Sequence, residues 1–278
     1  MALLALASLS AAQQRHALVI GLGEQQDEAW GKVNGDRDVP LVRGMLQEAG
    51  FGDIAELVNA QATKEGIVKA MEALCGRCKR GDIVYVHFSG HGQQMTDLDG
   101  DEADGLDETW VPYDACRKPC EQDQGERHLS DDEVYLLLSS IRKAIGEEGK
   151  LLVVIDACHS GDASRGQEQD DGAAVRGAWE VFRLDQGGTV AKTLGQRQEQ
   201  WVTVSACKSY QNNEELRGKR VGKLTYALSE LAKGGKRSNE EVEARLQAFM
   251  QDNPGRLPQT PEVTGLKGEM NITDVICN

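Results

Sequence analysis

Positive charge is scarce in this chain. Among its 278 residues, 31 lysine and arginine residues face 45 aspartate and glutamate residues, which gives a formal net charge of −14. Because phosphate backbones are bound by basic surfaces, this balance argues against nucleic acid as a partner. It suits a cationic substrate, although an acidic surface also serves simply to keep a protein soluble. As an explanation of the charge alone, the solubility interpretation is preferred.

Long apolar runs are also missing. No stretch approaches the ~18 apolar residues that a membrane-spanning helix needs. Residues 1–12 are small and apolar and end in Ser-Ala-Ala, like the end of a secretory signal that lacks its basic part. We therefore expect a signal-like segment over residues 1–14 and a secreted or periplasmic protein. The alternative is a truncated or tag-derived terminus, or a first helix, in a cytoplasmic protein.

The seven cysteines form no zinc pattern. Cys75 and Cys78 have the Cys-x-x-Cys spacing, but no second pair follows at the distance that a zinc site needs. In an exported protein, Cys75–Cys78 or Cys116–Cys120 would be local disulfides. In a cytoplasmic protein they would be thiols with no special role. Both interpretations stay open, with thiols preferred.

Three other binding motifs are incomplete. The glycine loop at the end of residues 17–23 lacks the third glycine of a dinucleotide fingerprint. Arg165 lies at Cys-x6-Arg from Cys158, whereas a phosphatase loop needs Cys-x5-Arg. The acidic stretch 97–108 partly matches an EF-hand loop but has Glu102 where that loop needs glycine. These gaps argue against nucleotide, phosphate and EF-hand sites.

Apolar runs that alternate with helical patterns predict the fold class. Residues expected to form strands are 17–23, 54–58, 82–88, 151–155, 201–206 and 262–266. Helical periodicity connects most of them, and a Ser-x-x-Glu capping box at Ser130 opens one of the helices. Such alternation is typical of a parallel sheet covered by helices. We predict a single α/β domain over residues 15–278, with a mostly parallel sheet of about six strands and helices on both faces.

Two of these strands end in reactive side chains. Leu151 to Ile155 are apolar and branched, as in a strand buried on both faces, and Cys158 follows where that strand enters its loop. The strand that begins at Asp82 ends in a Ser-Gly-His-Gly turn that presents His91. Ligands bind at the carboxyl edge of such sheets. We therefore expect Cys158 and His91 to form a Cys/His dyad.

Each reactive residue has a competing interpretation. A cysteine is more often a buried structural residue than a nucleophile, and only the paired His91 motif reverses that balance for Cys158. His159 is adjacent to Cys158 and would point to the opposite side of an extended chain. His87 lies inside a strand and is better explained as a packed core histidine. The spacing of His87 and His91 offers no third ligand for zinc.

Together, His-Phe-Ser-Gly-His-Gly at 87–92 and Asp-Ala-Cys-His-Ser-Gly at 156–161 resemble the caspase-fold cysteine peptidases, and among them the metacaspases of clan CD, peptidase family C14. The resemblance runs from about Ala17 to the C-terminus and is strongest at 82–114, 130–133 and 151–161. The separation of 158 − 91 = 67 residues exceeds the roughly 50 of caspases because an acidic insertion intervenes. The resemblance implies a caspase-like fold and a cysteine endopeptidase.

The resemblance also implies catalytic roles. Cys158 would attack the substrate carbonyl, and His91 would take the thiol proton and later pass it to the leaving amine. The backbone N–H groups of Gly92 and Cys158 would stabilise the oxyanion. The alternative is an inactive caspase-fold scaffold that binds peptides, but a scaffold requires neither Cys158 nor His91.

The positions that shape the specificity pocket of metacaspases match Asp38, Ser89 and Asp156. Carboxylates there would attract a guanidinium or an ammonium group, so the expected partners are peptides or proteins cleaved after Arg or Lys, and not after Asp. The simpler explanations are a helix N-terminal acid for Asp38 and a hydrogen-bonded structural carboxylate for Asp156. We expect the Asp156→Ala variant to lose basic substrates and keep its fold.

A calcium site is implied in the same way. The positions that bind activating Ca²⁺ in the family match Asp107, Asp131 and Asp132, whose oxygens suit that ion. A further family aspartate is Arg165 here, with Asp162 as a substitute. Asp131 and Asp132 would otherwise be ordinary first-turn acids favoured by the helix dipole.

Residues 162–200 are polar and show little periodicity, so we predict a long mobile loop beside the active site. If the enzyme cuts after basic residues, this loop is its nearest substrate. The candidate positions for self-cleavage in it are Arg165, Arg176, Arg183, Lys192 and Arg197.

Overall fold

The computed structural model describes residues 13–97, 100, 102, 104–158, 174–184, 199–256, 258–266 and 270–278. The signal-like residues 1–12 lie outside these ranges, as do Arg165, Lys192 and Arg197 among the expected cut sites. None of the helices in the described residues is long and apolar enough to cross a membrane.

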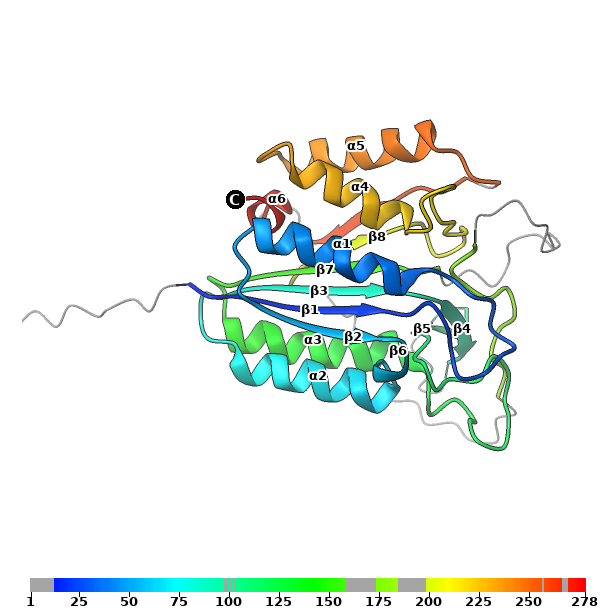
Figure 1. The fold of residues 1–278 in the computed structure, drawn as a ribbon. Coiled ribbons are helices and arrows are strands. Elements are labelled where there is room, and N and C mark those ends of the chain that lie inside the picture. The colour runs from blue at the N-terminus through cyan, green and yellow to red at the C-terminus, as the bar shows by residue number, and fades with distance from the viewer. Residues whose placement is uncertain are drawn as a thin grey trace, which may run out of the picture.

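The core of the molecule is a twisted sheet (Figure 1). In the described residues it has six strands in the order β2-β1-β3-β7-β8-β9. Their bounds are β1 Arg15–Gly21, β2 Asp53–Val58, β3 Ile83–Ser89, β7 Lys150–Asp156, β8 Val202–Ser205 and β9 Glu262–Gly265. Neighbouring strands pair in parallel except β9, which runs antiparallel to β8. The predicted mostly parallel sheet of about six strands is confirmed.

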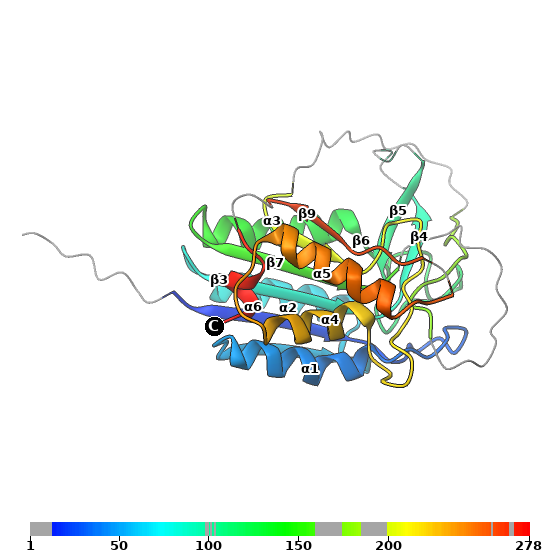
Figure 2. The ribbon, with the colours of Figure 1, turned by 90° about the horizontal axis from the view of Figure 1, so that it is seen from above.

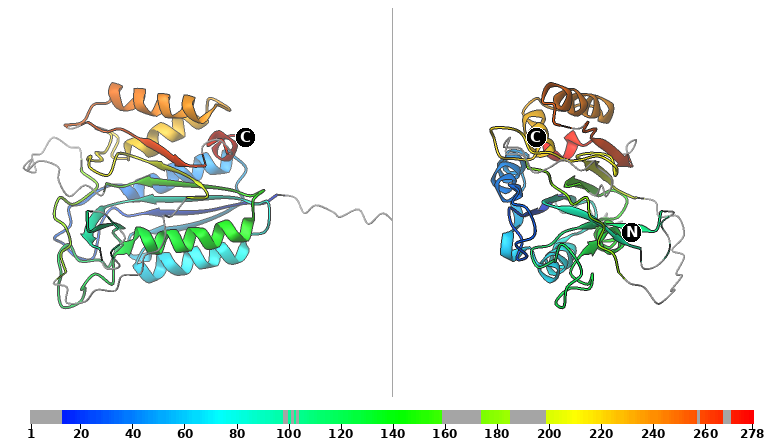
Figure 3. Two further views of the ribbon diagram at one scale, coloured as in Figure 1. Left: turned by 180° about the vertical axis from the view of Figure 1, so that it is seen from behind. Right: turned by 90° about the vertical axis from the view of Figure 1, so that its right-hand side faces the viewer.

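Helices cover both faces of this sheet. On one face lie α1 (Gly35–Glu48), α4 (Lys223–Ala232), α5 (Asn239–Asp252) and the short α6 (Thr273–Ile276). On the other lie α2 (Lys64–Arg77) and α3 (Asp131–Ile145), seen together below the sheet in Figure 1 and from behind in Figure 3. A short turn of 3₁₀ helix, η1 (Asn59–Gln61), links β2 to α2. A hydrophobic cluster fills the space between the sheet and each helical layer.

Local sequence explains where these elements begin. All seven residues of β3 are buried, as expected for a central strand with helices on both faces. The Ser130 side chain accepts the Glu133 N–H at the start of α3, and Glu133 returns a bond to the Ser130 N–H. The capping box predicted there is confirmed. Thr63 caps α2 through the Gly66 N–H in a similar way.

A smaller antiparallel sheet lies at the carboxyl edge of the main sheet and was not predicted. In the described residues it consists of β4 (Gly92–Thr96), β5 (Leu106–Trp110) and the two-residue β6 (Leu129–Ser130), in that order. Figure 2 shows β4 and β5 standing beyond the ends of the central strands. Because β4 starts immediately after the Gly90–His91 turn, this sheet forms one wall around His91.

The cysteines fall into both expected states. Cys116 and Cys120 are joined by a disulfide in the loop after β5. Cys75 and Cys78, at the end of α2, are free thiols. Burial raises the pKa of Cys78 to about 12, with a further contribution from Cys75. The preference for thiols therefore holds for the first pair and is wrong for the second.

Candidate active site

The pairing of β3 with β7 brings the two reactive motifs together. Ser89 lies directly opposite Asp156 at the ends of these parallel strands. His91 and Cys158 each follow two residues later, just beyond the carboxyl ends of β3 and β7. One register thus aligns both predicted dyad members and two of the three predicted pocket residues.

The environment of His91 fixes its tautomer. Its Nε2 lies 2.7 Å from the Gly31 carbonyl oxygen, which can only accept a hydrogen bond, so Nε2 carries the proton. The Nδ1 atom is buried and has no hydrogen-bond partner among the described residues, and the centroid of the Trp30 ring lies 4.9 Å from that of the imidazole. Burial lowers the pKa of His91 to about 4. The ring is therefore neutral near pH 7, with a lone pair on Nδ1.

Cys158 is buried at the start of the loop after β7. Its thiol donates to the Gln211 carbonyl oxygen at 2.8 Å. A second thiol, Cys207, shares that acceptor at 3.3 Å. A hydrogen bond with Cys158 and burial together raise the pKa of Cys207 well above its ordinary value. Sequence reasoning did not identify Cys207 or Gln211, since both lie in the loop after β8, roughly 50 residues from Cys158.

The described stretch 174–184 crosses this edge in an extended conformation. The Arg176 carbonyl oxygen accepts the Cys158 N–H at 2.8 Å and the Gly92 N–H at 3.4 Å. These are the two N–H groups expected to bind an oxyanion. The Arg176 N–H donates to Asn213 O at 2.9 Å, and Val175 pairs with Glu214 in an antiparallel bridge. The stretch therefore lies across Cys158 and Gly92 and pairs with the backbone on either side.

Pairing continues beyond Arg176 on the other wall. The Ala178 N–H donates to Gly92 O at 3.1 Å, and the Phe182 N–H donates to Gln94 O at 2.8 Å. The Phe182 side chain is fully buried, with its ring 4.5 Å from that of His128. We expected the whole of 162–200 to be a mobile loop. The described part, 174–184, is instead packed, because apolar residues such as Phe182 anchor an otherwise polar sequence.

Gly177 passes directly over Cys158. A Cβ atom built on this glycine would lie 2.7 Å from Cys158 O, 3.0 Å from its Cβ and 3.2 Å from its Sγ. Such approaches require a neighbour to move, so glycine is what permits the chain to lie this close to Cys158. The peptide bond between Arg176 and Gly177 is therefore the one beside the thiol.

The Arg176 side chain is fully buried among the predicted pocket residues. Its Nη1 donates to Asp38 Oδ2 at 2.7 Å and to Ser89 Oγ at 2.5 Å, and Asp156 Oδ1 lies 3.5 Å away. Glu215 Oε1 accepts from the opposite edge of the guanidinium, from Nε at 3.2 Å and Nη2 at 3.1 Å. The structure thus brings Asp38, Ser89 and Asp156 together around one arginine and adds Glu215, which the sequence analysis missed.

The pocket carboxylates differ in their electrostatics. Burial raises the pKa of Asp38 to about 6, against the opposing charge of Arg176. Burial acts in the same direction on Asp156, but the Arg176 charge and hydrogen bonds from Thr225 and Asn213 outweigh it and lower its pKa. Asp156 therefore carries the more stable negative charge of the two.

Asp156 also has the structural role that was considered as its simpler explanation. Its Oδ2 accepts the backbone N–H of Thr225 at 2.9 Å, near the start of α4, and the Thr225 hydroxyl at 2.6 Å. Its Oδ1 accepts Asn213 Nδ2 at 2.7 Å. The expectation that Asp156→Ala leaves the fold intact therefore needs correction, because that change strips partners from three buried donors. His87 is a buried core histidine between Tyr85 and Thr225, as expected.

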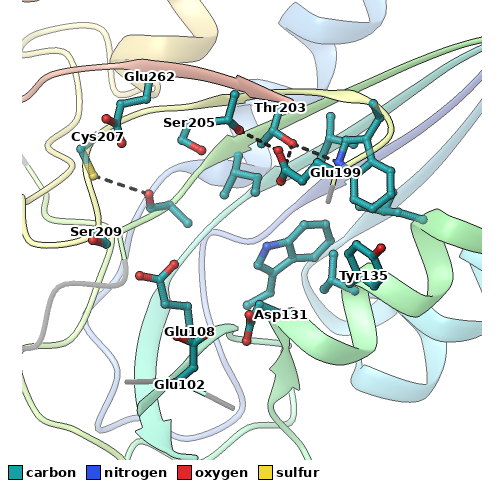
Figure 4. Close-up of a pocket in the computed structure, with 18 residues that line it drawn as sticks. Glu102, Glu108, Asp131, Tyr135, Glu199, Thr203, Ser205, Cys207, Ser209 and Glu262 are labelled. Atoms are coloured by element: carbon teal, nitrogen blue, oxygen red, sulfur yellow. Dashed lines mark hydrogen bonds between the residues drawn. The ribbon is translucent and has the colours of Figure 1, made fainter. Parts of the chain in front are cut away.

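Two of the three expected calcium ligands lie on α3, which covers the face of the sheet opposite to the face that α4 covers. Asp107 is on β5, and Asp131 and Asp132 open α3, close to it because Thr109 pairs with Ser130. Asp131 lines a cavity of about 370 Å³ together with Glu102 and Glu108 (Figure 4). Carboxylate oxygens are suitable calcium ligands. Within the described residues, however, no three acidic, histidine or cysteine side chains converge closely enough to hold a metal ion, and Asp162 and Arg165 lie outside them.

Comparison with known proteins agrees with this geometry. A family model described as metacaspase, peptidase C14 domain, matches residues 15–165. Metacaspase-1 of Pyricularia oryzae is 32% identical over 162 residues, covering 54% of this chain and 37% of that protein. Metacaspase-1A of Aspergillus clavatus is 36% identical over 161 residues, covering 54% of this chain and 34% of that protein. The matched part thus spans about a third of the length of these relatives.

Solved structures share the fold. The crystal structure of a Geobacter sulfurreducens protein has a TM-score of 0.65 at 24% identity, covering 90% of this chain and 92% of its own. Caspase-1 from Spodoptera frugiperda has a TM-score of 0.61 at 13% identity, covering 91% and 87%. The caspase-like fold is therefore confirmed. With the family model matching more than half of its length, the chain belongs to the metacaspase family, defined by its peptidase C14 domain.

Proposed function

We propose that this protein is a cysteine endopeptidase that cuts after arginine or lysine and cuts itself between Arg176 and Gly177. The observation that carries the proposal is the position of Arg176. Its guanidinium lies among Asp38, Ser89 and Asp156, while its carbonyl oxygen accepts the Cys158 and Gly92 N–H groups. A bound substrate would have its cleaved residue in this position.

The proposed reaction requires the Cys158 thiol to leave the Gln211 carbonyl oxygen and turn to His91 Nδ1, which has no partner among the described residues. His91 Nδ1 takes the thiol proton, and the Cys158 sulfur attacks the carbonyl carbon of the basic residue. The Cys158 and Gly92 N–H groups stabilise the negative charge that develops on the carbonyl oxygen. His91 then gives its proton to the leaving amide nitrogen, which in self-cleavage belongs to Gly177. Water hydrolyses the thioester, and Cys158 recovers its proton.

Peptides with a reporter after Arg, Lys or Asp test this proposal. Wild-type protein should cleave the Arg and Lys peptides and leave the Asp peptide intact. Cys158→Ala and His91→Ala should each lower the rate roughly a thousandfold or more, because nucleophile and base act as one unit. Hydrolysis of the Asp peptide, or full activity of the Cys158→Ala variant, would refute it. Failure of an electrophilic arginine peptide to label Cys158 would favour the inactive scaffold.

Calcium stimulation is a further part of the proposal, with Asp107, Asp131 and Asp132 as the ligand candidates. Asp107 lies on β5, which pairs with the strand that leads into α3, where Asp131 and Asp132 lie, and carboxylate oxygens suit a hard cation. Addition of Ca²⁺ to Cys158→Ala protein should raise its melting temperature, and the combined Asp131→Asn and Asp132→Asn changes should remove that shift. Equal melting temperatures with Ca²⁺ and with a chelator would remove calcium from the account.

A further inference from the structure

Among the described residues, Glu215 is the one that accepts from the Nε and Nη2 edge of the buried Arg176 guanidinium. Its Oε1 lies 3.2 Å from Nε and 3.1 Å from Nη2 of Arg176, so it accepts from the edge of the guanidinium plane. Asp38 and Ser89 instead hold Nη1. The two ends of the guanidinium are therefore bound by different groups on different segments.

The carboxylate of Glu215 is also held in place by groups other than the guanidinium. The backbone N–H of Asn34 donates to its Oε1 and the Asn34 side-chain amide donates to its Oε2, both at 2.5 Å. Only 2% of the side chain is exposed. The Glu215 backbone N–H also donates to Ala174 O at 2.9 Å, two residues before the cleaved position. A preorganised acceptor costs little reorganisation when the ligand binds.

Lysine cannot use this acceptor as arginine does. Arginine presents a rigid planar set of donors, and lysine presents a single compact ammonium group at the end of a flexible stem. An ammonium group near the position of Nη1 would find Asp38 and Ser89. It has no second nitrogen to reach the opposite edge, so Glu215 would lack the donors that Nε and Nη2 supply.

We infer that Glu215 is a specificity-determining residue that makes this pocket select arginine over lysine. The inference rests on the proposed function, since it concerns the same pocket. Asp38 and Asp156 attract either cation by their charge. Glu215 adds recognition of the planar guanidinium, which only arginine has.

The test compares two peptides that differ only in Arg or Lys before the cleaved bond. Wild type should show the higher kcat/KM for the Arg peptide. In Glu215→Gln the kcat/KM for Arg should fall roughly 10- to 100-fold, the range expected for loss of a hydrogen bond to a charged group. The value for Lys should fall less, because its ammonium group makes no hydrogen bond to Glu215 and loses only the more distant Coulomb attraction. The Arg-to-Lys ratio should therefore collapse, mainly through KM for arginine.

Glu214→Gln is the matched control. This neighbouring residue is as deeply buried, and its carboxylate accepts the backbone N–H of Arg256. The Arg-to-Lys ratio of kcat/KM in the Glu214→Gln variant should stay at the wild-type value. The Glu215→Asp variant keeps the negative charge on a side chain that is one methylene shorter. It should give an Arg-to-Lys ratio between those of wild type and Glu215→Gln, and it provides the test if the glutamine variant does not fold.

The outcomes separate the two proposals. A wild-type enzyme that cleaves neither peptide refutes the proposed function, and the inference falls with it. A wild-type enzyme that cleaves the Arg peptide, together with an unchanged ratio in both Glu215 variants, refutes the role of Glu215 alone. Equal loss on both peptides would show a structural role and would likewise overturn the inference.

Discussion

At the scale of single residues, the pocket divides its tasks between two aspartates. Asp38 lies 2.7 Å from the Arg176 guanidinium, and Asp156 lies 3.5 Å from it while binding Thr225 and Asn213. Asp38 thus mainly contacts the Arg176 guanidinium, whereas Asp156 mainly supports the surrounding structure. Variants of each should separate catalytic loss from loss of stability.

The Asp38→Asn variant should be primarily a catalytic defect. The change keeps the size of the side chain and removes the charge nearest the guanidinium, so kcat/KM for an Arg peptide should fall roughly 10- to 100-fold. Steady-state kinetics with matched melting curves measure this. Wild-type kinetics in Asp38→Asn would mean that substrate arginine does not bind where Arg176 lies.

The Asp156→Ala variant should lose stability as well as activity. It leaves the buried donors of Thr225, Asn213 and Arg176 without their carboxylate, and such losses cost on the order of 3 kcal/mol. Urea unfolding in the Cys158→Ala background, which prevents self-cleavage, gives the free energy. Asp156→Asn is the control and should lose less. A free energy of unfolding equal to that of the background protein would contradict this assignment.

The sequence identified five of the residues around Arg176, namely Asp38, Ser89, His91, Asp156 and Cys158. Cys158 and His91 follow from strand ends, where residues reach a known edge of the sheet, whereas Asp38, Ser89 and Asp156 came from the resemblance to the metacaspase pocket. Gln211, Asn213 and Glu215 were missed because a loop without periodicity delivers them from more than fifty residues beyond Cys158. Arg176 was listed as a cut site, but nothing in the sequence distinguished it from the other basic residues nearby.

At the scale of elements, the segment 174–184 acts as a strand between two walls. One wall is the stretch around Asn213 and Glu214, and the other is β4. The main strands and capped helices were predictable from apolar runs and cap residues. The sheet β4–β5–β6 and this segment were not, because their sequences are polar and their pairing partners are distant.

The Phe182→Ala variant should loosen this segment. Removing a fully buried ring costs roughly 3 kcal/mol of packing, so the segment should occupy the active site less often. Self-cleavage should slow, and freshly prepared enzyme should hydrolyse an added Arg peptide faster. Gel densitometry and initial rates measure both effects. Arg183→Ala, an exposed neighbour, should change neither rate. If Phe182→Ala behaves like Arg183→Ala, the segment does not compete for the site.

At the scale of the whole molecule, acid should destabilise the fold through its buried histidines. Burial lowers the pKa values of His87, His91 and His128 to about 4. An unfolded histidine binds its proton near pH 6.5, so the unfolded state binds more protons between pH 6.5 and 4, and stability falls as the pH drops through that range. Asp38, with its pKa raised to about 6, opposes this in part.

Melting temperatures of the Cys158→Ala protein between pH 7 and 4 test this expectation. They should fall as the pH decreases, and His128→Gln should show a shallower decrease because one buried imidazole is gone. A melting temperature that is constant or rises on acidification would show that these histidines are not buried in their neutral form.

The most direct test of the central claim is the mass of the protein after incubation, with and without Ca²⁺. Wild type should yield two fragments whose masses and new N-terminus place the cut between Arg176 and Gly177. Cys158→Ala should stay intact, and Arg176→Gln should not be cut at this bond. An active wild-type enzyme that is never cut there, or a Cys158→Ala protein cut at the same bond, would contradict the account.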